Sequence, residues 1–182
     1  MRVIAGTARS LILKAPMGDG TRPTTDRIKE TLFNMLQSDV PGSVFVDLFA
    51  GSGGIGIEAL SRGAKHAYFA ENGKEALACI EYNVKHCKFE DESTILKQDA
   101  ITALGYSIKD KADIIFCDAP YDKGYDRMVL ETALRSNCVT EDTLIIIEEL
   151  KDTDFSYALD LGYEIIKEKI YKSNKHVFLR KA

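Results

Sequence analysis

Long apolar runs are missing from this chain of 182 residues, and so are cysteine pairs and histidine clusters. No apolar stretch approaches the ~20 residues that a membrane-spanning helix needs, and the first residues lack the apolar core of an export signal. We therefore expect a cytoplasmic protein without membrane contact. The four cysteines, Cys79, Cys87, Cys117 and Cys138, form no CxxC pair, and the three histidines are scattered. We predict free, buried thiols and no metal site.

The charges are unevenly distributed along the chain, although the net charge is only −4. Residues 1–36 carry six basic and three acidic side chains, and residues 163–182 carry six and two. Residues 37–162 carry 12 basic and 23 acidic side chains. This pattern fits an acidic catalytic body whose terminal segments meet phosphate, although solvated surface lysines would produce the same pattern.

Strand-like and helix-like segments alternate without a repeat or a linker, which predicts one domain over residues 1–182. Strand, helix and strand in succession indicate an α/β fold with a mostly parallel, Rossmann-like sheet covered by helices on both faces. The expected strands are 44–48, 67–70, 94–96, 112–117 and 143–147, and the expected helices are 55–62, 74–87 and 127–135. Asn72 and Glu75 resemble a capping box at the start of the second helix.

Both ends of the chain depart from this alternation. Residues 163–171 and 176–179 flank a turn signal, which predicts a C-terminal antiparallel hairpin. Near the start, Thr24 or Thr25 can cap a helix whose apolar residues recur at helical spacing and whose other face offers Arg27 and Lys29. Before that helix, residues 2–5 and 10–14 could form a small hairpin. We expect residues 1–36 to form an extension and residues 37–182 the catalytic sheet.

A glycine-rich turn, Asp47-Leu-Phe-Ala-Gly-Ser-Gly-Gly-Ile-Gly56, follows the first strand of the sheet. Its glycines fit a nicotinamide dinucleotide site, and Glu71, 20 positions after Gly51, fits one as well. Asp47 favours another cofactor, because a carboxylate repels a pyrophosphate but attracts the sulfonium and ammonium of S-adenosylmethionine. Glu71 can accept hydrogen bonds from ribose hydroxyls, and Asp99 can accept one from the adenine amine above Ala100. For both acids a role at the start of a helix is the alternative.

The tetrad Asp118-Ala119-Pro120-Tyr121 directly follows the expected strand 112–117. A base amine is a poor nucleophile because its lone pair is delocalised, so an enzyme must orient it. Asp118 and the carbonyl near Pro120 can accept hydrogen bonds from the amine, and Tyr121 can stack on the base. A simple turn after a strand is the alternative, but the glycine turn that precedes the tetrad favours methylation of an amine.

Three segments together resemble the RsmD family of bacterial 16S rRNA guanine-N2 methyltransferases. They are Asp47–Ala64, the more specific Arg22–Asn34 and Arg2–Gly6, and the similarity runs nearly end to end. The resemblance implies a seven-stranded class I methyltransferase sheet, S-adenosylmethionine as donor and one guanine of the small ribosomal subunit as acceptor. It also implies that residues 22–25 close over the methionine end of the cofactor and that the N-terminal hairpin helps to bind RNA.

The resulting site prediction has three parts. The catalytic residues are Asp118, Pro120 and Tyr121. The cofactor contacts are Arg22, Thr24, Asp47, Phe49, Ala50, Gly51, Gly53, Glu71, Asn72, Asp99, Ala100 and Asp118. The RNA contacts are Arg2, Arg9, Arg22, Arg27 and Lys29, in a protein that we expect to be a monomer.

The sequence departs from the family pattern at two places. Ala119 stands where the family usually has proline, which removes a backbone restraint from the tetrad. The first hairpin is also less basic than is usual. Two other functions therefore remain open: amine methylation of DNA adenine or of a protein glutamine, and a non-catalytic, cofactor-binding assembly factor.

Overall fold

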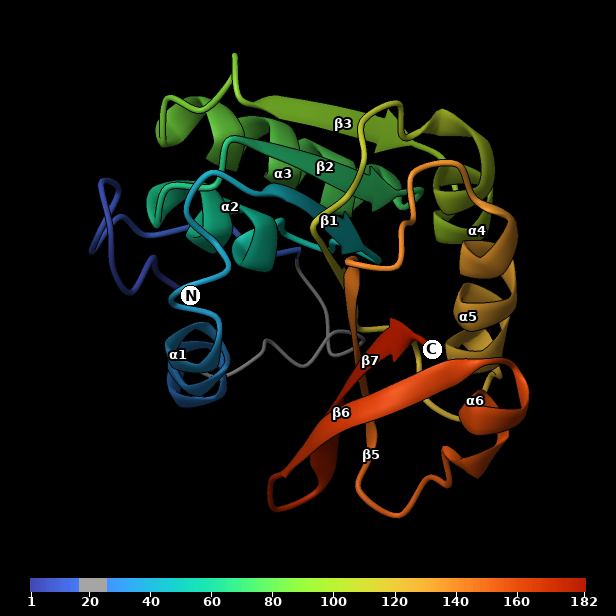
Figure 1. Cartoon of the computed structure of the whole chain (residues 1–182). Coiled ribbons are helices and arrows are strands. Elements are labelled where there is room, and N and C mark those ends of the chain that lie inside the picture. The colour runs from blue at the N-terminus through green and yellow to red at the C-terminus, as the bar shows by residue number, and fades with distance from the viewer. Residues whose placement is uncertain (17–25) are drawn as a thin grey trace.

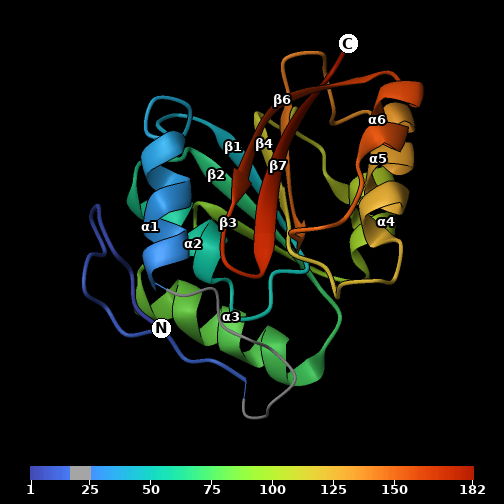
Figure 2. The ribbon, with the colours of Figure 1, turned by 90° about the horizontal axis from the view of Figure 1, so that it is seen from below.

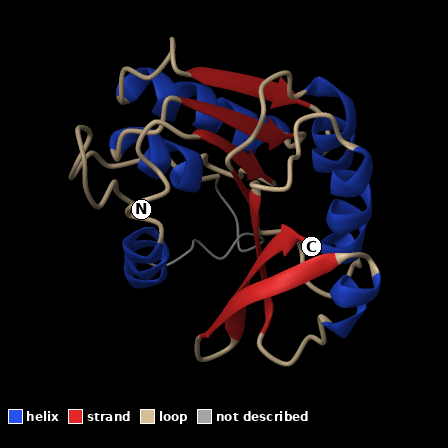
Figure 3. Ribbon diagram, in the orientation of Figure 1, coloured by secondary structure: helices blue, strands red, loops and turns tan. Residues whose placement is uncertain are grey.

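A single sheet forms the centre of the protein, in a computed structural model that describes residues 1–16 and 26–182. Its described strands are β1 (Val44–Leu48), β2 (His66–Glu71), β3 (Ser93–Lys97), β4 (Ile114–Cys117), β5 (Leu144–Leu150), β6 (Tyr163–Ile170) and β7 (Asn174–Lys181). Their order in the sheet is β3-β2-β1-β4-β5-β7-β6 (Figures 1 and 3). Strands β1 to β5 are parallel, and β7 pairs antiparallel with β5 and β6. The predicted seven-stranded, mostly parallel sheet with a C-terminal antiparallel hairpin is confirmed.

Helices cover both faces of this sheet. They are α1 (Asp26–Met35), α2 (Gly54–Ser61), α3 (Lys74–His86), α4 (Ala100–Thr102), the π-helical turn η1 (Ala103–Ser107), α5 (Tyr125–Arg135) and α6 (Ser156–Asp160). Helices α1, α2 and α3 lie on one side, and α4, α5 and α6 lie on the other (Figure 2). The two short helices α4 and α6 have three and five residues, too few for a periodic pattern in the sequence.

The core has two layers, because successive side chains of a strand point to opposite faces of the sheet. In β4, Ile114 and Phe116 pack on the side of α2 and α3, whereas Ile115 and Cys117 pack on the side of α5. All four side chains are buried. Burial on both faces explains why the parallel strands read as continuous apolar runs rather than as alternating ones.

The N-terminal segment lies against the end of α2. Thr7 N donates a hydrogen bond to Ser61 O at 2.8 Å, and Gly6 has φ 83°. A Cβ atom at Gly6 would lie 1.7 Å from Ser61 O, so the close approach requires glycine here. The two segments of the predicted hairpin lie antiparallel, with one bridge between Arg2 and Ile12 and hydrogen bonds from Val3 N to Leu11 O and from Leu13 N to Met1 O, both at 3.0 Å. The predicted cap of α1, Thr24 or Thr25, lies outside the described residues.

The predicted capping box at Asn72 is wrong. Helix α3 begins after Gly73, and no side chain caps it. The backbone N–H groups of Asn72 and Gly73 instead donate to Glu71 Oε1, at 2.8 and 2.7 Å. The carboxylate at the end of β2 therefore takes the Asn72 N–H that Glu75 would have accepted in a capping box. None of the described helices is long and apolar enough to cross a membrane.

Candidate functional site

The glycine turn and the tetrad leave the sheet side by side. Strands β1 and β4 are paired, with Leu48 opposite Cys117, so the residues that follow each strand are neighbours at one edge. The strand order reverses here, because β2 and β3 lie on one side of β1 whereas β4 and β5 lie on the other. In open α/β sheets, ligands bind in the crevice at the carboxyl ends of the strands at such a switch point.

The glycine turn leads directly into α2. Gly51 and Gly53 have φ angles of 56° and 77°, which glycine adopts without strain. A Cβ atom at Gly51 would meet nothing within 4 Å, whereas one at Gly56 would lie 2.4 Å from the Phe69 ring. Gly51 thus borders open space, and Gly56 lets the helix approach the sheet.

Asp47 lies beneath this turn and is 2% exposed. Its Oδ2 accepts a hydrogen bond from Gly56 N at 2.9 Å, so the carboxyl group satisfies a donor in the first turn of α2. Burial raises the pKa of Asp47 to about 8, against the opposing hydrogen bond from Gly56. The side chain points at the helix, so direct contact with a cofactor stays a prediction.

Glu71 links the glycine turn to the start of α3. Its Oε2 accepts from Gly51 N at 2.9 Å, while Oε1 accepts from Asn72 and Gly73. A carboxylate has about four acceptor sites, so these three bonds leave capacity for one ribose hydroxyl. Its place at the end of β2, bonded to the turn, fits the predicted role.

Asp99 caps α4. Its Oδ1 accepts from Thr102 N at 2.9 Å, and this hydrogen bond lowers the pKa of Asp99. Asp99 is exposed, and the neighbouring Ala100 is buried. Both proposed roles of Asp99, the helix cap and the adenine contact, are compatible with this geometry.

Two aromatic residues, Phe49 and Tyr125, lie beside the turn, and only Phe49 was predicted to belong to the site. Phe49, a predicted cofactor contact, has φ 59°, an uncommon and strained conformation for a residue with a side chain. Its ring meets that of Tyr125, from the start of α5, edge to face with centroids 4.9 Å apart. This contact ties the loop after β4 to the glycine turn.

The residues of the tetrad differ in burial. Asp118 is half-buried, Ala119 is packed in the core at 6% exposure, and Pro120 is exposed. Burial, and then the negative charges of Glu148 and Glu149, raise the pKa of Asp118 well above its usual value. A carboxyl group with a raised pKa is a stronger proton acceptor when it is ionised.

Sequence reasoning missed the partner of Tyr121. The Tyr121 hydroxyl donates to Glu148 Oε1 at 2.8 Å, and burial together with the charge of Glu148 raises the pKa of Tyr121. The signal was present, because Glu148 and Glu149 are charged residues at the end of the apolar strand β5. The predicted strand ended at Ile147 and so left them out.

The predicted RNA contacts divide into two groups. Arg2, Arg9 and Arg27 are exposed, and Arg2 pairs with Asp26 at 3.0 Å. Lys29 has no exposed surface and lies 3.2 Å from the buried Glu58, which contradicts its assignment to RNA. Its side chain turns into the core because Glu58 and the Arg2 carbonyl provide acceptors there. Arg22 and Thr24 lie outside the described residues.

The cysteines are free, and three of the four are buried; Cys79 is partly exposed. Within residues 1–16 and 26–182, no group of three or more His, Cys, Asp or Glu side chains is arranged to hold a metal ion.

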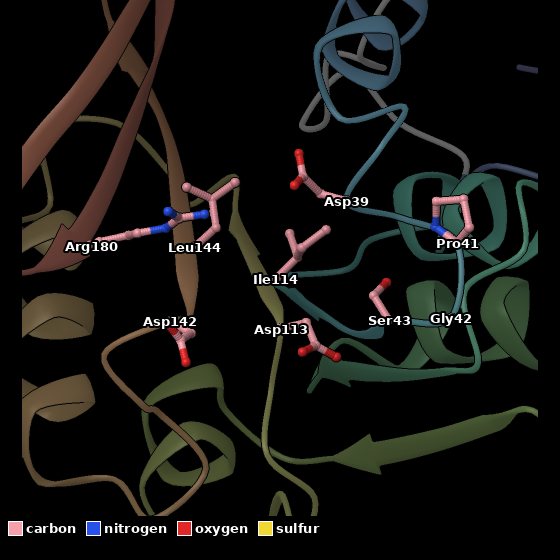
Figure 4. Close-up of a pocket in the computed structure, with 9 residues that line it drawn as sticks. All are labelled: Asp39, Pro41, Gly42, Ser43, Asp113, Ile114, Asp142, Leu144 and Arg180. Carbon is pink, nitrogen blue, oxygen red and sulfur yellow. The ribbon is translucent and has the colours of Figure 1, made fainter.

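A separate cavity of about 250 Å³ lies at the opposite end of the sheet, at the amino ends of β1, β4 and β5 (Figure 4). Its polar lining includes Asp39, Ser43, Asp113, Asp142 and Arg180. The parallel strands separate it from the glycine turn and the tetrad, which follow the carboxyl ends. It therefore takes no part in the candidate site.

The residues present fit S-adenosylmethionine. The turn leaves open space at Gly51. Two carboxylates suited to hydroxyl and amine groups lie at the ends of neighbouring strands, since Glu71 is the last residue of β2 and Asp99 follows β3.

The sheet order, the glycine turn and the tetrad define a protein with the class I methyltransferase fold. Three comparisons place it further. A family model described as Conserved hypothetical protein 95 matches residues 1–180. Ribosomal RNA small subunit methyltransferase D of Haemophilus influenzae is 34% identical over 84% of this chain and 80% of its own. The Bacillus subtilis protein YlbH is 36% identical over 85% of both chains.

A solved structure supports the same relationship. The Escherichia coli protein yhhF has a TM-score of 0.84 and 26% identity, covering 100% of this chain and 97% of its own. The chain belongs to the Conserved hypothetical protein 95 family, which is the RsmD family that its sequence resembles.

Proposed function

We propose that this protein transfers a methyl group from S-adenosylmethionine to the exocyclic N2 of one guanine of 16S rRNA in the small ribosomal subunit. The observation that carries the proposal is the pairing of Leu48 with Cys117, which brings the cofactor turn and the amine-binding tetrad together. Relatives named as small subunit rRNA methyltransferases support the substrate class. We further propose that the protein acts in the cytoplasm, as a monomer.

The chain's own residues have three tasks in this reaction. The bound cofactor would supply a methyl carbon on a positively charged sulfur. Asp118 accepts a hydrogen bond from the guanine amine and directs the amine lone pair toward that carbon. The exposed Pro120 leaves its loop open to the base, and the Tyr121 ring stacks on the base, a contact worth about 1–3 kcal/mol. Holding the reacting atoms in line can contribute about 7–11 kcal/mol.

Proton transfer completes the reaction. Methylation leaves the amine with an additional proton, which must be lost. The raised pKa of Asp118 suits the ionised carboxylate to accept it. No covalent intermediate with the protein is required.

The RNA would lie along the basic N-terminal extension. Arg2, Arg9 and Arg27 are exposed there and can neutralise phosphates. Extruding a base from a duplex costs a few kcal/mol, which favours an unpaired guanine in a loop or junction.

Ala119 bears on the non-catalytic alternative. Its side chain is packed among apolar core residues on the side of α5, so packing restrains the backbone where a proline would otherwise do so. This supports a tetrad that keeps its shape and favours an active enzyme over a cofactor-binding assembly factor.

Two measurements test the proposed function. Mass spectrometry of rRNA from a strain that lacks the gene should show one missing N2-methylguanine, and an unchanged set of modifications would contradict the proposal. Purified protein should transfer methyl groups to assembled small subunits or naked rRNA in preference to DNA or protein. Preferential methylation of DNA adenine or of a glutamine would support the alternative amine substrates.

A further inference from the structure

Glu148 is a buried carboxylate that three side chains approach at hydrogen-bonding distance. It lies on β5 and is 5% exposed. Oε1 accepts from the Tyr121 hydroxyl at 2.8 Å and from Asn174 Nδ2 at 2.6 Å, and Oε2 lies 2.8 Å from His176 Nε2. One partner is the aromatic residue of the tetrad, and the other two belong to β7 of the C-terminal hairpin.

The sheet fixes this arrangement. Strands β5 and β7 are antiparallel, with Glu148 opposite His176 and Leu150 opposite Asn174. The His176 ring is fully buried, and it meets the Phe116 ring edge to face with centroids 5.7 Å apart. Tyr171 Oη lies 3.2 Å from His176 Nδ1 on the other side. Backbone pairing and ring packing therefore hold the two hairpin side chains in place before any ligand binds.

Glu148 is ionised in this setting. Burial acts to raise the pKa of Glu148, but the hydrogen bonds from His176, Tyr121 and Asn174 hold it below its usual value. An ionised acceptor makes a shorter and stronger hydrogen bond than a neutral one. A buried carboxylate is weak support for a purely stabilising role, because the cost of desolvation offsets much of the attraction to its partners. The shared partner Tyr121 points to a different role.

We propose that Glu148 is a positioning residue: held by Asn174 and His176, it fixes the ring plane of Tyr121 so that a nucleobase finds the stacking surface already oriented. This inference rests on the proposed function for the identity of the ligand. It also assigns the C-terminal hairpin, which sequence reasoning left outside the site, to the support of the base-binding residues.

The hydrogen bond to Glu148 can fix the Tyr121 ring because the hydroxyl lies at the opposite end of the side chain from the backbone. The backbone of Tyr121 is held in the tetrad loop at one end of the side chain, and the hydroxyl is held by Glu148 at the other. Fixing both ends leaves the ring one orientation. Without the second anchor the ring would lose its rotational freedom only when the base binds, and that entropy loss would weaken binding. Neither Glu148 nor the Tyr121 hydroxyl exchanges protons with the amine, so at a pH where Asp118 is ionised the effect falls on substrate binding rather than on the chemical step.

The kinetic test compares Tyr121→Phe, Glu148→Gln and the double variant on the RNA substrate. At a pH above the acid limb, where Asp118 is ionised in every variant, each single change should raise KM for RNA by about 3- to 10-fold and leave kcat and the cofactor Kd within about twofold. The double variant should be no worse than Tyr121→Phe, because glutamine replaces the ionised acceptor by a weaker, neutral one in a hydrogen bond that phenylalanine has already removed. Tyr68→Phe is the matched control: its hydroxyl donates to the Asp110 carboxylate at 2.6 Å, away from the tetrad. It should leave KM unchanged.

A second readout does not depend on activity. Protein labelled with 3-fluorotyrosine gives one fluorine resonance for each of its eight tyrosines, and Tyr121→Phe identifies that of Tyr121 by its absence. Glu148→Gln should shift and narrow the Tyr121 resonance as the ring becomes mobile, with the other resonances in place as evidence of folding. An unmoved Tyr121 resonance, or a wild-type KM in Tyr121→Phe, would overturn the proposal. If wild-type protein methylates no RNA but Glu148→Gln still releases the ring, the anchoring stands and the proposed function fails.

Discussion

The Lys29 ammonium lies 3.2 Å from Glu58 Oε2, and neither side chain is exposed to solvent. Glu58 also accepts hydrogen bonds from Ile4 N and Ala5 N and pairs with Arg62. Helix α1, helix α2 and the N-terminal segment therefore meet at one carboxylate. Because α2 begins at the glycine turn, this contact joins the proposed RNA-binding extension to the proposed cofactor site.

Replacing Lys29 with methionine should destabilise the protein. Removing one partner of a buried ion pair leaves the other charge poorly compensated, which typically costs about 3–5 kcal/mol. Arg62 and the two backbone donors still compensate Glu58, so we expect the lower end, about 3 kcal/mol, in denaturant unfolding. Arg27→Met is the matched control on the same helix and should change the free energy of unfolding by no more than about 0.5 kcal/mol. A similar loss in both variants would contradict the role of the pair.

A comparison of Lys29 with the exposed arginines distinguishes a structural charge from charges that bind RNA. Removing an exposed arginine that meets a phosphate should reduce the slope of log binding constant against log salt by about one unit. We expect this for Arg9→Ala and Arg27→Ala, whose side chains are exposed. Lys29→Met, assayed where it remains folded, should keep the wild-type slope. Unchanged slopes for both arginine variants would show that the N-terminal extension does not bind the RNA phosphates.

Local sequence patterns were sufficient to predict the strands and the loops that directly follow them. Strand β1 was predicted residue for residue, and the glycine turn and tetrad could be placed because each directly follows a buried apolar run. Lys29 was misassigned because its partner is 29 positions away on another helix (58 − 29). The capping box at Asn72 failed for a local reason, since the neighbouring Glu71 takes the Asn72 N–H that Glu75 would have accepted.

Long-range pairing explains the largest omission from the site. Glu148 and His176 are 28 positions apart in sequence and become neighbours only when β5 and β7 pair. A charged pair at the end of an apolar strand was a visible signal, but its partner depended on the register of the hairpin. The sequence of a hairpin indicates its existence more reliably than its register.

Asp47 should make stability depend on pH. Burial raises its pKa to about 8, so the folded protein holds a proton on Asp47 that the unfolded chain releases near pH 4. The folded state thus binds more protons between about pH 4 and 8, and this contribution to stability is lost as pH rises through that range. Asp47→Asn keeps an acceptor for Gly56 N but does not titrate. As pH rises through this range, the variant should therefore gain stability relative to wild type by at most about 1.4 kcal/mol per pH unit. Urea unfolding at pH 5 and pH 8 measures the free energy of unfolding of both proteins. If the difference between them is the same at both pH values, Asp47 has an ordinary pKa.

Asp118 should control the acid limb of methyl transfer. The ionised carboxylate orients the amine and accepts its proton, so activity is lost as pH falls through the pKa of Asp118. Because burial and the charges of Glu148 and Glu149 raise that pKa, the loss should occur well above the usual range of an aspartate. Asp118→Asn should lower kcat by about 10²- to 10⁴-fold with cofactor binding retained.

Glu149→Gln tests the electrostatic origin of the shift. It removes one of the negative charges that raise the pKa of Asp118 and leaves Asp118 in place. The acid limb should therefore move to lower pH, while kcat at high pH stays near the wild-type value. Profiles of kcat/KM from about pH 5 to 9 for both proteins make the comparison. Identical limbs would mean that another group limits the reaction, and full activity of Asp118→Asn would remove Asp118 from the mechanism.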